Sequence, residues 1–227
     1  MAALLRIAAL LAYFAVAHRA LRIDSPGQAG LALGLLAVVV CIHGLLSLRL
    51  RAWLVALAWT GAAWALAGSR YAVPVLLLMP SLFLALACSL FARTLPRGRV
   101  PLVVRMVSLI DGMPPDRLPD DVRRYATGVT RLWAGLLGGL SLLNLVLALN
   151  TTPGGVLERL GSGSPWPVHP DTAATVATWG IYVPVAATMV GEFMFRQRRF
   201  PNRYAGPLDY IRKLARVPRE AWAGIFH

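Results

Sequence analysis

Six stretches of this sequence are apolar over nearly the length that a helix needs to cross a lipid bilayer. About 20 residues, each rising about 1.5 Å, span the hydrocarbon layer. Hydrophobic residues fill 57% of the 227 positions and charged residues only 15%, so one soluble core cannot hold the apolar content. We therefore predict an all-α fold, a polytopic membrane helix bundle with about six transmembrane helices. The six stretches are residues 2–17, 29–48, 52–68, 71–91, 132–149 and 172–195.

The first stretch is compatible with two interpretations. Residues 2–17 contain one charged side chain, Arg6, and end in Ala15-Val16-Ala17, a small-x-small sequence typical of a signal-peptide cleavage site. The other interpretation, which we favour, is a retained helix. Either one leaves the order of the later spans unchanged.

The long polar interruption at residues 93–131 divides the chain. We predict four parts and no soluble domain. They are a four-helix N-terminal membrane part (1–92), a cytoplasmic amphipathic and basic loop (93–131), a transmembrane hairpin (132–195) and a basic cytoplasmic tail (196–227).

The charge distribution predicts the orientation in the membrane. The formal net charge is +13. If both termini are cytoplasmic, 19 basic residues lie on the cytoplasmic side and 4 on the other. Membrane proteins concentrate Lys and Arg in their cytoplasmic loops, so we predict that both termini lie inside. We expect no nucleic-acid partner, because the basic residues flank apolar spans and no nucleic-acid motif accompanies them.

The loop at 93–131 contains two predicted helices. Apolar residues recur at helical spacing from position 100 to position 110, which indicates an amphipathic helix in the lipid headgroup plane. Gly112 and the prolines that follow it end this helix. A second helix begins at Pro119-Asp120-Asp121 and runs into the fifth span. The tail at 207–217 repeats the amphipathic pattern.

Two interpretations of the loop and the tail remain open. Both segments could simply anchor the bundle to membrane lipids with anionic headgroups. Alternatively, arginines such as Arg105, Arg123 and Arg124 form a cytoplasmic platform for an acidic protein partner or an anionic acyl substrate.

Among the polar side chains within the predicted spans, His43 and Asn144 are the two that we single out. We interpret His43 as a packing residue, although an ionisable group inside a membrane also suggests a function. Asn144 lies in the same span as Gly135, Gly138 and Gly139, a composition typical of a helix-packing face.

Glu192 is the acidic residue that we place at the edge of a span, and it requires a partner there. Arg196 follows four residues later, on the same helix face. Arg131 stands at the start of the neighbouring fifth span, so we expect it to reach the same depth. The contact is either a structural clasp between two helices or part of a binding site.

No residue set in the sequence spells out an enzymatic reaction. Cys41 and Cys88 lie in apolar stretches, which disfavour the thiolate that a nucleophilic cysteine needs. The four histidines are scattered without metal-ligand spacing. We therefore predict no catalytic residues, no metal and no cofactor. We favour a protein that is not an enzyme.

The C-terminal half also resembles a known family. It reads LIDGMPPDRLPDDVRRYATGVTRLW, then a span, a polar loop and a span that ends in GEFMFRQRRFP. This order is similar to small bacterial inner-membrane proteins that are encoded with the genes for aryl polyene pigments of the xanthomonadin type. Ala126 departs from the family, which often has threonine there. With Arg131 added, the matching positions give a candidate cluster of Arg124, Tyr125, Thr130, Arg131, Trp133, Glu192 and Arg196.

The resemblance implies membership of a pigment pathway in the bacterial inner membrane. Members are sometimes labelled ketosynthase, but the cysteines and histidines do not form a condensing site. We expect a non-catalytic accessory protein that contacts membrane lipids and recruits or hands over intermediates bound to an acidic acyl carrier protein. The alternative is a transporter or membrane enzyme that acts on the polyene lipid itself.

The predicted orientation can be tested with reporter fusions. Reporters placed after Arg97 and at His227 should be active on the cytoplasmic side, and a reporter near Gly161 should be active on the periplasmic side. A periplasmic signal at Arg97 would contradict both the orientation and a cytoplasmic platform.

Overall fold

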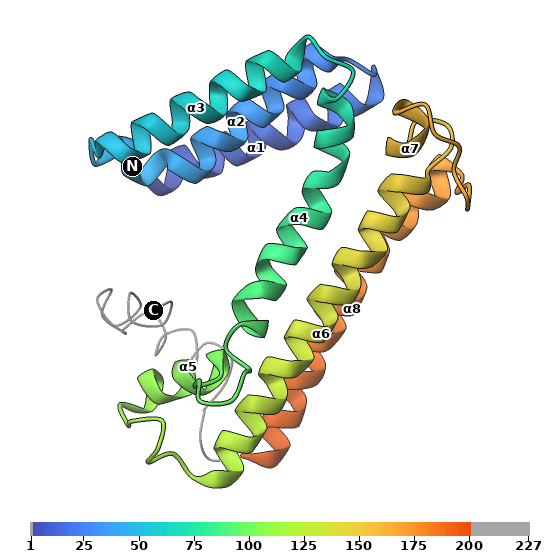
Figure 1. Cartoon of the computed structure of the whole chain (residues 1–227). Coiled ribbons are helices and arrows are strands. Elements are labelled where there is room, and N and C mark those ends of the chain that lie inside the picture. Colours follow the sequence, from blue (N-terminus) through green and yellow to red (C-terminus); the bar gives the residue numbers. More distant parts are fainter. Residues whose placement is uncertain (1, 201–227) are drawn as a thin grey trace. The chain divides into compact units, whose positions relative to one another are not determined.

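The computed structural model describes residues 2–200, apart from the side chains of residues 2, 3 and 43. The predicted amphipathic tail at 207–217 lies outside this range. Within it, the regular structure consists of helices, with one isolated bridge between Thr151 and Val168 (Figure 1). The predicted all-α class is confirmed. The helices are α1 (Ala2–Arg22), α2 (Pro26–Leu46), α3 (Leu50–Ala67), α4 (Ala72–Ala92), α5 (Leu102–Asp111), α6 (Asp120–Asn150), α7 (Val156–Arg159) and α8 (Pro170–Arg199).

Five of the described helices are long and apolar enough to cross a membrane: α1, α3, α4, α6 and α8. The apolar part identified in α2, Pro26–Ile42, is shorter than the five long helices. The membrane span expected at residues 29–48 therefore stays a prediction. Only 6% of the span window in α8 is buried inside the protein. Apolar helices that expose most of their surface need a lipid environment, and this chain is therefore a membrane protein.

The described chain forms two compact units. Unit 1 contains the residues up to Met79 together with Leu145–Ala173, and unit 2 contains Pro80–Asn144 and the chain from Ala174 on. The division differs from the four sequential parts expected from the sequence, because α4, α6 and α8 each contribute residues to both units. One long helix can contribute residues to two compact units, and its hydropathy does not show where one unit ends and the other begins.

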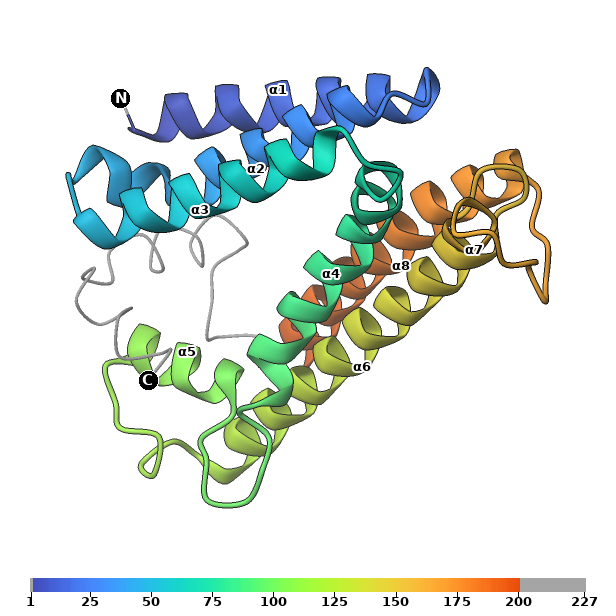
Figure 2. The ribbon, with the colours of Figure 1, turned by 45° about the horizontal axis from the view of Figure 1, so that its top comes forward.

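In unit 1, α2 packs against both α1 and α3 (Figures 1 and 2). The buried core is rich in alanine, which lets helix backbones approach closely. At Gly30 the approach leaves no room for a side chain, since a Cβ there would lie 2.8 Å from Cα of Ala67. Trp59 packs against this core, as expected for a tryptophan in the middle of a span.

The connection between α6 and α8 belongs to unit 1 and is folded rather than extended. The backbone amide of Thr152 donates to the carbonyl of Val168 at 2.9 Å. Arg159 in α7 forms an ion pair with Asp24, in the turn between α1 and α2, at 2.6 Å. These contacts fix the connection against the first helix pair of the unit.

In unit 2, α6 and α8 lie side by side and antiparallel (Figures 1 and 2). The Tyr125 hydroxyl is in contact with Glu192 near the start of α6, and Gly180 lies beside Leu143 farther along. On another side of α6 packs the second half of α4, where Ser141 Oγ donates to the carbonyl of Ser81 at 2.8 Å.

In the glycine-rich stretch of α6, one glycine lies against a neighbouring helix. A Cβ at Gly138 would meet the Cys88 sulfur of α4 at 3.3 Å, whereas Gly135 and Gly139 have open space around them. The prediction of one packing face for all three glycines is therefore wrong. At spacings of i, i+3 and i+4 the three glycines do share one side of the helix, but of the three only Gly138 lies close to α4.

The amphipathic helix α5 ends as the sequence predicts, at a left-handed Gly112 with φ 64°. Its apolar face, however, packs against protein: Val104 is buried with Leu118 and Ala126 of the α5–α6 connection and α6. An apolar stripe cannot by itself distinguish a lipid surface from a neighbouring helix, because both cover it equally well. The helix α5 is thus held on unit 2, and its place in the lipid headgroup plane stays a prediction.

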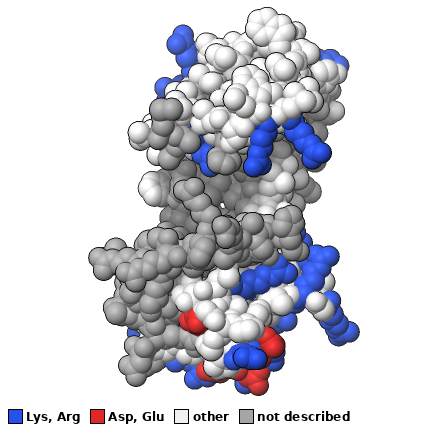
Figure 3. All heavy atoms as spheres, turned by 90° about the vertical axis from the view of Figure 1, so that its left-hand side faces the viewer, with Lys and Arg blue, Asp and Glu red and all other residues white. Residues whose placement is uncertain are grey.

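Exposed arginines gather at one end of unit 2, and Figure 3 shows basic and acidic side chains together on its surface. They lie at the end of α4, around α5, in the first turns of α6 and at the end of α8. One of them, Arg123, pairs with Asp120 at 2.9 Å. Arg105 is only partly exposed. We call the exposed set the basic face: Arg93, Arg97, Arg99, Arg117, Arg123, Arg124, Arg131, Arg198 and Arg199.

Candidate functional site

The structure divides the candidate cluster among three sides of α6. Tyr125 contacts Glu192 and, through it, Arg196 of α8. Thr130 contacts α5, and Trp133 stacks on Phe91 of α4 with ring centroids 6.3 Å apart. The remaining two members, Arg124 and Arg131, are exposed.

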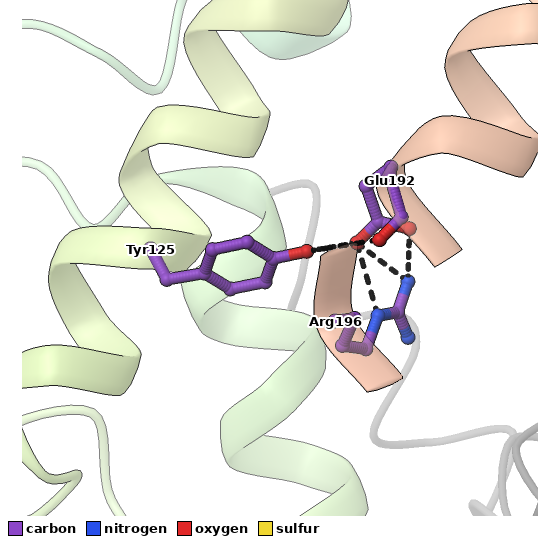
Figure 4. Close-up of polar contacts among 3 residues, drawn as sticks. All are labelled: Tyr125, Glu192 and Arg196. Atoms are coloured by element: carbon purple, nitrogen blue, oxygen red, sulfur yellow. Dashed lines mark hydrogen bonds and ion pairs between the residues drawn. The ribbon is translucent and has the colours of Figure 1, made fainter. Parts of the chain in front are cut away.

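Tyr125 of α6 contacts an ion pair within α8 that is formed by Glu192 and Arg196 (Figure 4). The tyrosine hydroxyl donates to Oε1 of Glu192 at 2.7 Å. The Arg196 guanidinium donates to Oε1 through Nε at 3.0 Å and to Oε2 through Nη2 at 2.5 Å. A two-nitrogen contact of this kind fixes the carboxylate in one orientation.

The Glu192 side chain is nearly buried, with 10% of its surface exposed, and that of Arg196 is 22% exposed. A carboxylate at this depth needs both a countercharge and hydrogen-bond donors, and these two residues supply them. The predicted pairing of Glu192 with Arg196 is confirmed. The arrangement ties α8 to α6, so it acts as a clasp, the term we use for these three residues.

The prediction that Arg131 reaches the same depth as Glu192 is wrong. Among the described residues, no ion pair joins the two, and Tyr125 occupies the place on α6 that we assigned to Arg131. Tyr125 and Arg131 are six residues apart, so they point about 120° away from each other around the helix. Six residues also correspond to about 9 Å along the helix, so Arg131 does not lie level with Glu192 either.

Two aromatic rings that the sequence analysis did not identify pack against Tyr125 of the clasp. Phe195 stacks on the Tyr125 ring with centroids 5.7 Å apart, and Phe200 meets the same ring edge-on at 5.6 Å. Phe195 lies three residues after Glu192, on the same face of α8. That spacing is the signal that could have identified it.

A groove adjoins the clasp on the surface of unit 2. Its volume is about 340 Å³. It lies between α6 and α8, and its lining is almost entirely apolar apart from the clasp itself. The lining residues are Tyr125, Gly128, Val129, Leu132, Gly191, Glu192 and Phe195.

Thr130 has a structural role. Its side chain is completely buried, its hydroxyl donates to the carbonyl of Ala126 at 2.8 Å, and it accepts the backbone amide of Val103 at 3.3 Å. Thr94 likewise accepts the amide of Leu102 at 3.0 Å. Amides in the first turn of a helix have no partner within the helix, so these two threonines satisfy the start of α5.

Of the two intramembrane polar residues, the structure describes the side chain of Asn144. Asn144 is buried and donates to the carbonyl of Leu140 in its own helix at 3.0 Å, rather than across to a neighbour. The His43 side chain lies outside the described residues. Cys88 donates to the carbonyl of Ala134 at 3.2 Å. Within the described part of the chain, no three His, Cys, Asp or Glu side chains gather where they could hold a metal ion.

The fold and the clasp define the class of this protein, an all-α membrane protein in which a tyrosine of α6 donates a hydrogen bond to a glutamate of an ion pair within α8. No protein-family model, curated protein or solved structure matches the chain. A more particular function is therefore a matter for proposal.

The clasp can be tested with a double-mutant cycle. Tyr125→Phe and Glu192→Gln should each destabilise the purified protein in detergent by about 1–2 kcal/mol, because each removes a hydrogen bond to or from a buried charged group. The double variant should lose about 1 kcal/mol less than the two single losses combined, since the contact can be broken only once. Thermal unfolding measures all three.

The matched control is Tyr182→Phe, because Tyr182 is a strongly exposed tyrosine on α8. It should leave the unfolding temperature unchanged. Strict additivity of Tyr125→Phe and Glu192→Gln would contradict the clasp.

Proposed function

We propose that this chain is an integral accessory protein of the bacterial inner membrane that serves aryl polyene pigment biosynthesis of the xanthomonadin type. In this role it recruits acyl carrier protein to the membrane, or takes part in handing over the acyl intermediate that the carrier holds. Both termini lie in the cytoplasm in this proposal.

The observation that carries the proposal is the basic face. Nine exposed arginines belong to the segments at one end of unit 2, and the acidic residues exposed among them are three, Asp116, Asp120 and Asp121. Acyl carriers are acidic, so their approach to such a surface is accelerated and oriented by charge. The start of α5, which lies among these segments, is joined to α6 through Thr130, which accepts the backbone amide of Val103.

The pathway assignment is supported by the sequence resemblance. Three residues on which that resemblance rests, Tyr125, Glu192 and Arg196, contact one another in the clasp. Because the three residues contact one another, they form one structural unit, which supports treating them as one motif. The choice of the aryl polyene pathway in this proposal rests on the sequence resemblance alone.

The pathway can be tested by deleting the gene from a pigment-producing host. The proposal expects polyene intermediates to accumulate on the carrier protein, because their hand-over at the membrane is impaired. Extraction of carrier-bound, inner-membrane and outer-membrane fractions measures this. Finished pigment stranded in the inner membrane would instead favour transport, and unchanged pigment would contradict a role in the pathway.

The basic face can be tested by carrier binding. The triple variant Arg93→Gln, Arg97→Gln, Arg117→Gln should bind purified carrier protein more weakly than the unchanged protein does in nanodiscs. Each exposed charge pair contributes about 0.2–1 kcal/mol, so we expect a loss of about 10-fold for three. Binding to the unchanged protein should also weaken as salt rises, since the screening length is about 10 Å at 0.1 M.

The matched control removes three exposed arginines from unit 1, with Arg19→Gln, Arg22→Gln and Arg70→Gln. The net charge changes equally, but these residues lie on the predicted periplasmic side. Equal loss of carrier binding in both triple variants would contradict a specific basic face.

A further inference from the structure

The groove beside the clasp has no part in carrier recruitment, yet its position and lining indicate an occupant. It lies between two helices that are both candidate membrane spans. Side chains at its border are open to the surroundings, Leu132 with 50% and Phe195 with 57% of their surface exposed. In a bilayer, the surroundings of such a groove are the acyl chains of lipids.

Glycines shape the groove. Gly128 on α6 and Gly191 on α8 line it, and a Cβ built at either position would meet no atom within 4 Å. The missing side chains therefore leave real space. Along α6 the lining extends from Tyr125 to Leu132, seven residues, or about 10 Å at the rise of a helix. The groove is thus elongated along the helix pair, as an acyl chain requires.

Positive charge flanks one end of the groove. Arg124 lies four residues before Gly128, one turn nearer the start of α6, and Arg198 lies three residues after Phe195, one turn nearer the end of α8. Both arginines are exposed. Because α6 and α8 are antiparallel, the start of α6 and the end of α8 meet at the same end of unit 2. Apolar lining leads away from that end.

We propose that this groove is a binding site for an anionic phospholipid of the bilayer, with one acyl chain between α6 and α8 and its phosphate at Arg124 and Arg198. The chain gains only packing contacts, because it leaves one apolar environment for another. Selectivity therefore comes from the phosphate, which arginine recognises with two parallel hydrogen bonds. The lipid covers the clasp on its exposed side.

The test is native mass spectrometry of the full chain, released from detergent with dioleoyl phosphatidylglycerol or, separately, dioleoyl phosphatidylcholine. We expect one retained phosphatidylglycerol and little phosphatidylcholine. Gly128→Leu and Gly191→Leu each fill the groove and should abolish retention. The control is Gly61→Leu, since Gly61 is also an exposed helical glycine with open space around it, and it lies on α3. It should retain the lipid.

A second set of variants tests the phosphate contact. Arg124→Gln and Arg198→Gln should each reduce the preference for phosphatidylglycerol about fivefold, the contribution of one arginine near an anionic lipid. The controls are Arg49→Gln, directly before α3, and Arg51→Gln, in the first turn of α3; both arginines are exposed, and both variants should preserve the preference.

Three results would overturn the proposal. One is retention of phosphatidylglycerol by a folded Gly128→Leu or Gly191→Leu protein at the level of Gly61→Leu, with folding checked by thermal unfolding. Another is equal retention of both lipids by the unchanged protein. The third is an undiminished preference after loss of both Arg124 and Arg198. Arg124 and Arg198 also belong to the basic face, but the carrier-binding test changes Arg93, Arg97 and Arg117 instead, so its failure leaves these results unaffected.

Discussion

In the hydrocarbon of a bilayer a peptide group finds no water to bond, and this constraint governs the rest of the structure. A helix satisfies its amides and carbonyls internally, so the long apolar stretches of the chain become helices. The ends of helices remain costly, and here side chains complete them: Thr94 and Thr130 accept the first amides of α5. The connection after α6 bonds to itself and, through Arg159, to Asp24.

Once the helices exist, apolar contact alone does little to hold them together, because lipid covers an apolar face as well as protein does. Close approach and polar contacts then decide which helices meet. Gly30 lets α2 approach α3, and Gly138 lets α6 approach α4. The clasp joins α6 to α8 by a buried carboxylate that is costly to expose to lipid and stable only with both partners.

The arginines of unit 2 differ in whether they are used inside the protein or exposed on its surface. Arg196 is used within the protein to neutralise Glu192, whereas the arginines of the basic face extend outward. One set fixes the helix pair, and the other remains exposed to an acidic carrier or to lipid phosphate. The groove adjoins the clasp, because Tyr125 and Glu192 belong to its lining, and the phosphate site that we propose at Arg124 and Arg198 lies near that same end.

The sequence by itself determined the helices, the break at Gly112, the start of α6 at Asp120 and the pairing of Glu192 with Arg196, since each depends on neighbours along the chain. The tertiary structure decided which side of α6 meets α8, so that Tyr125 and not Arg131 reaches Glu192. It also turned the apolar face of α5 toward Leu118 and Ala126. Hydropathy and spacing describe how apolar or how deep a residue is. The direction in which a side chain points toward a partner helix depends on the packing of whole helices, which no local pattern contains.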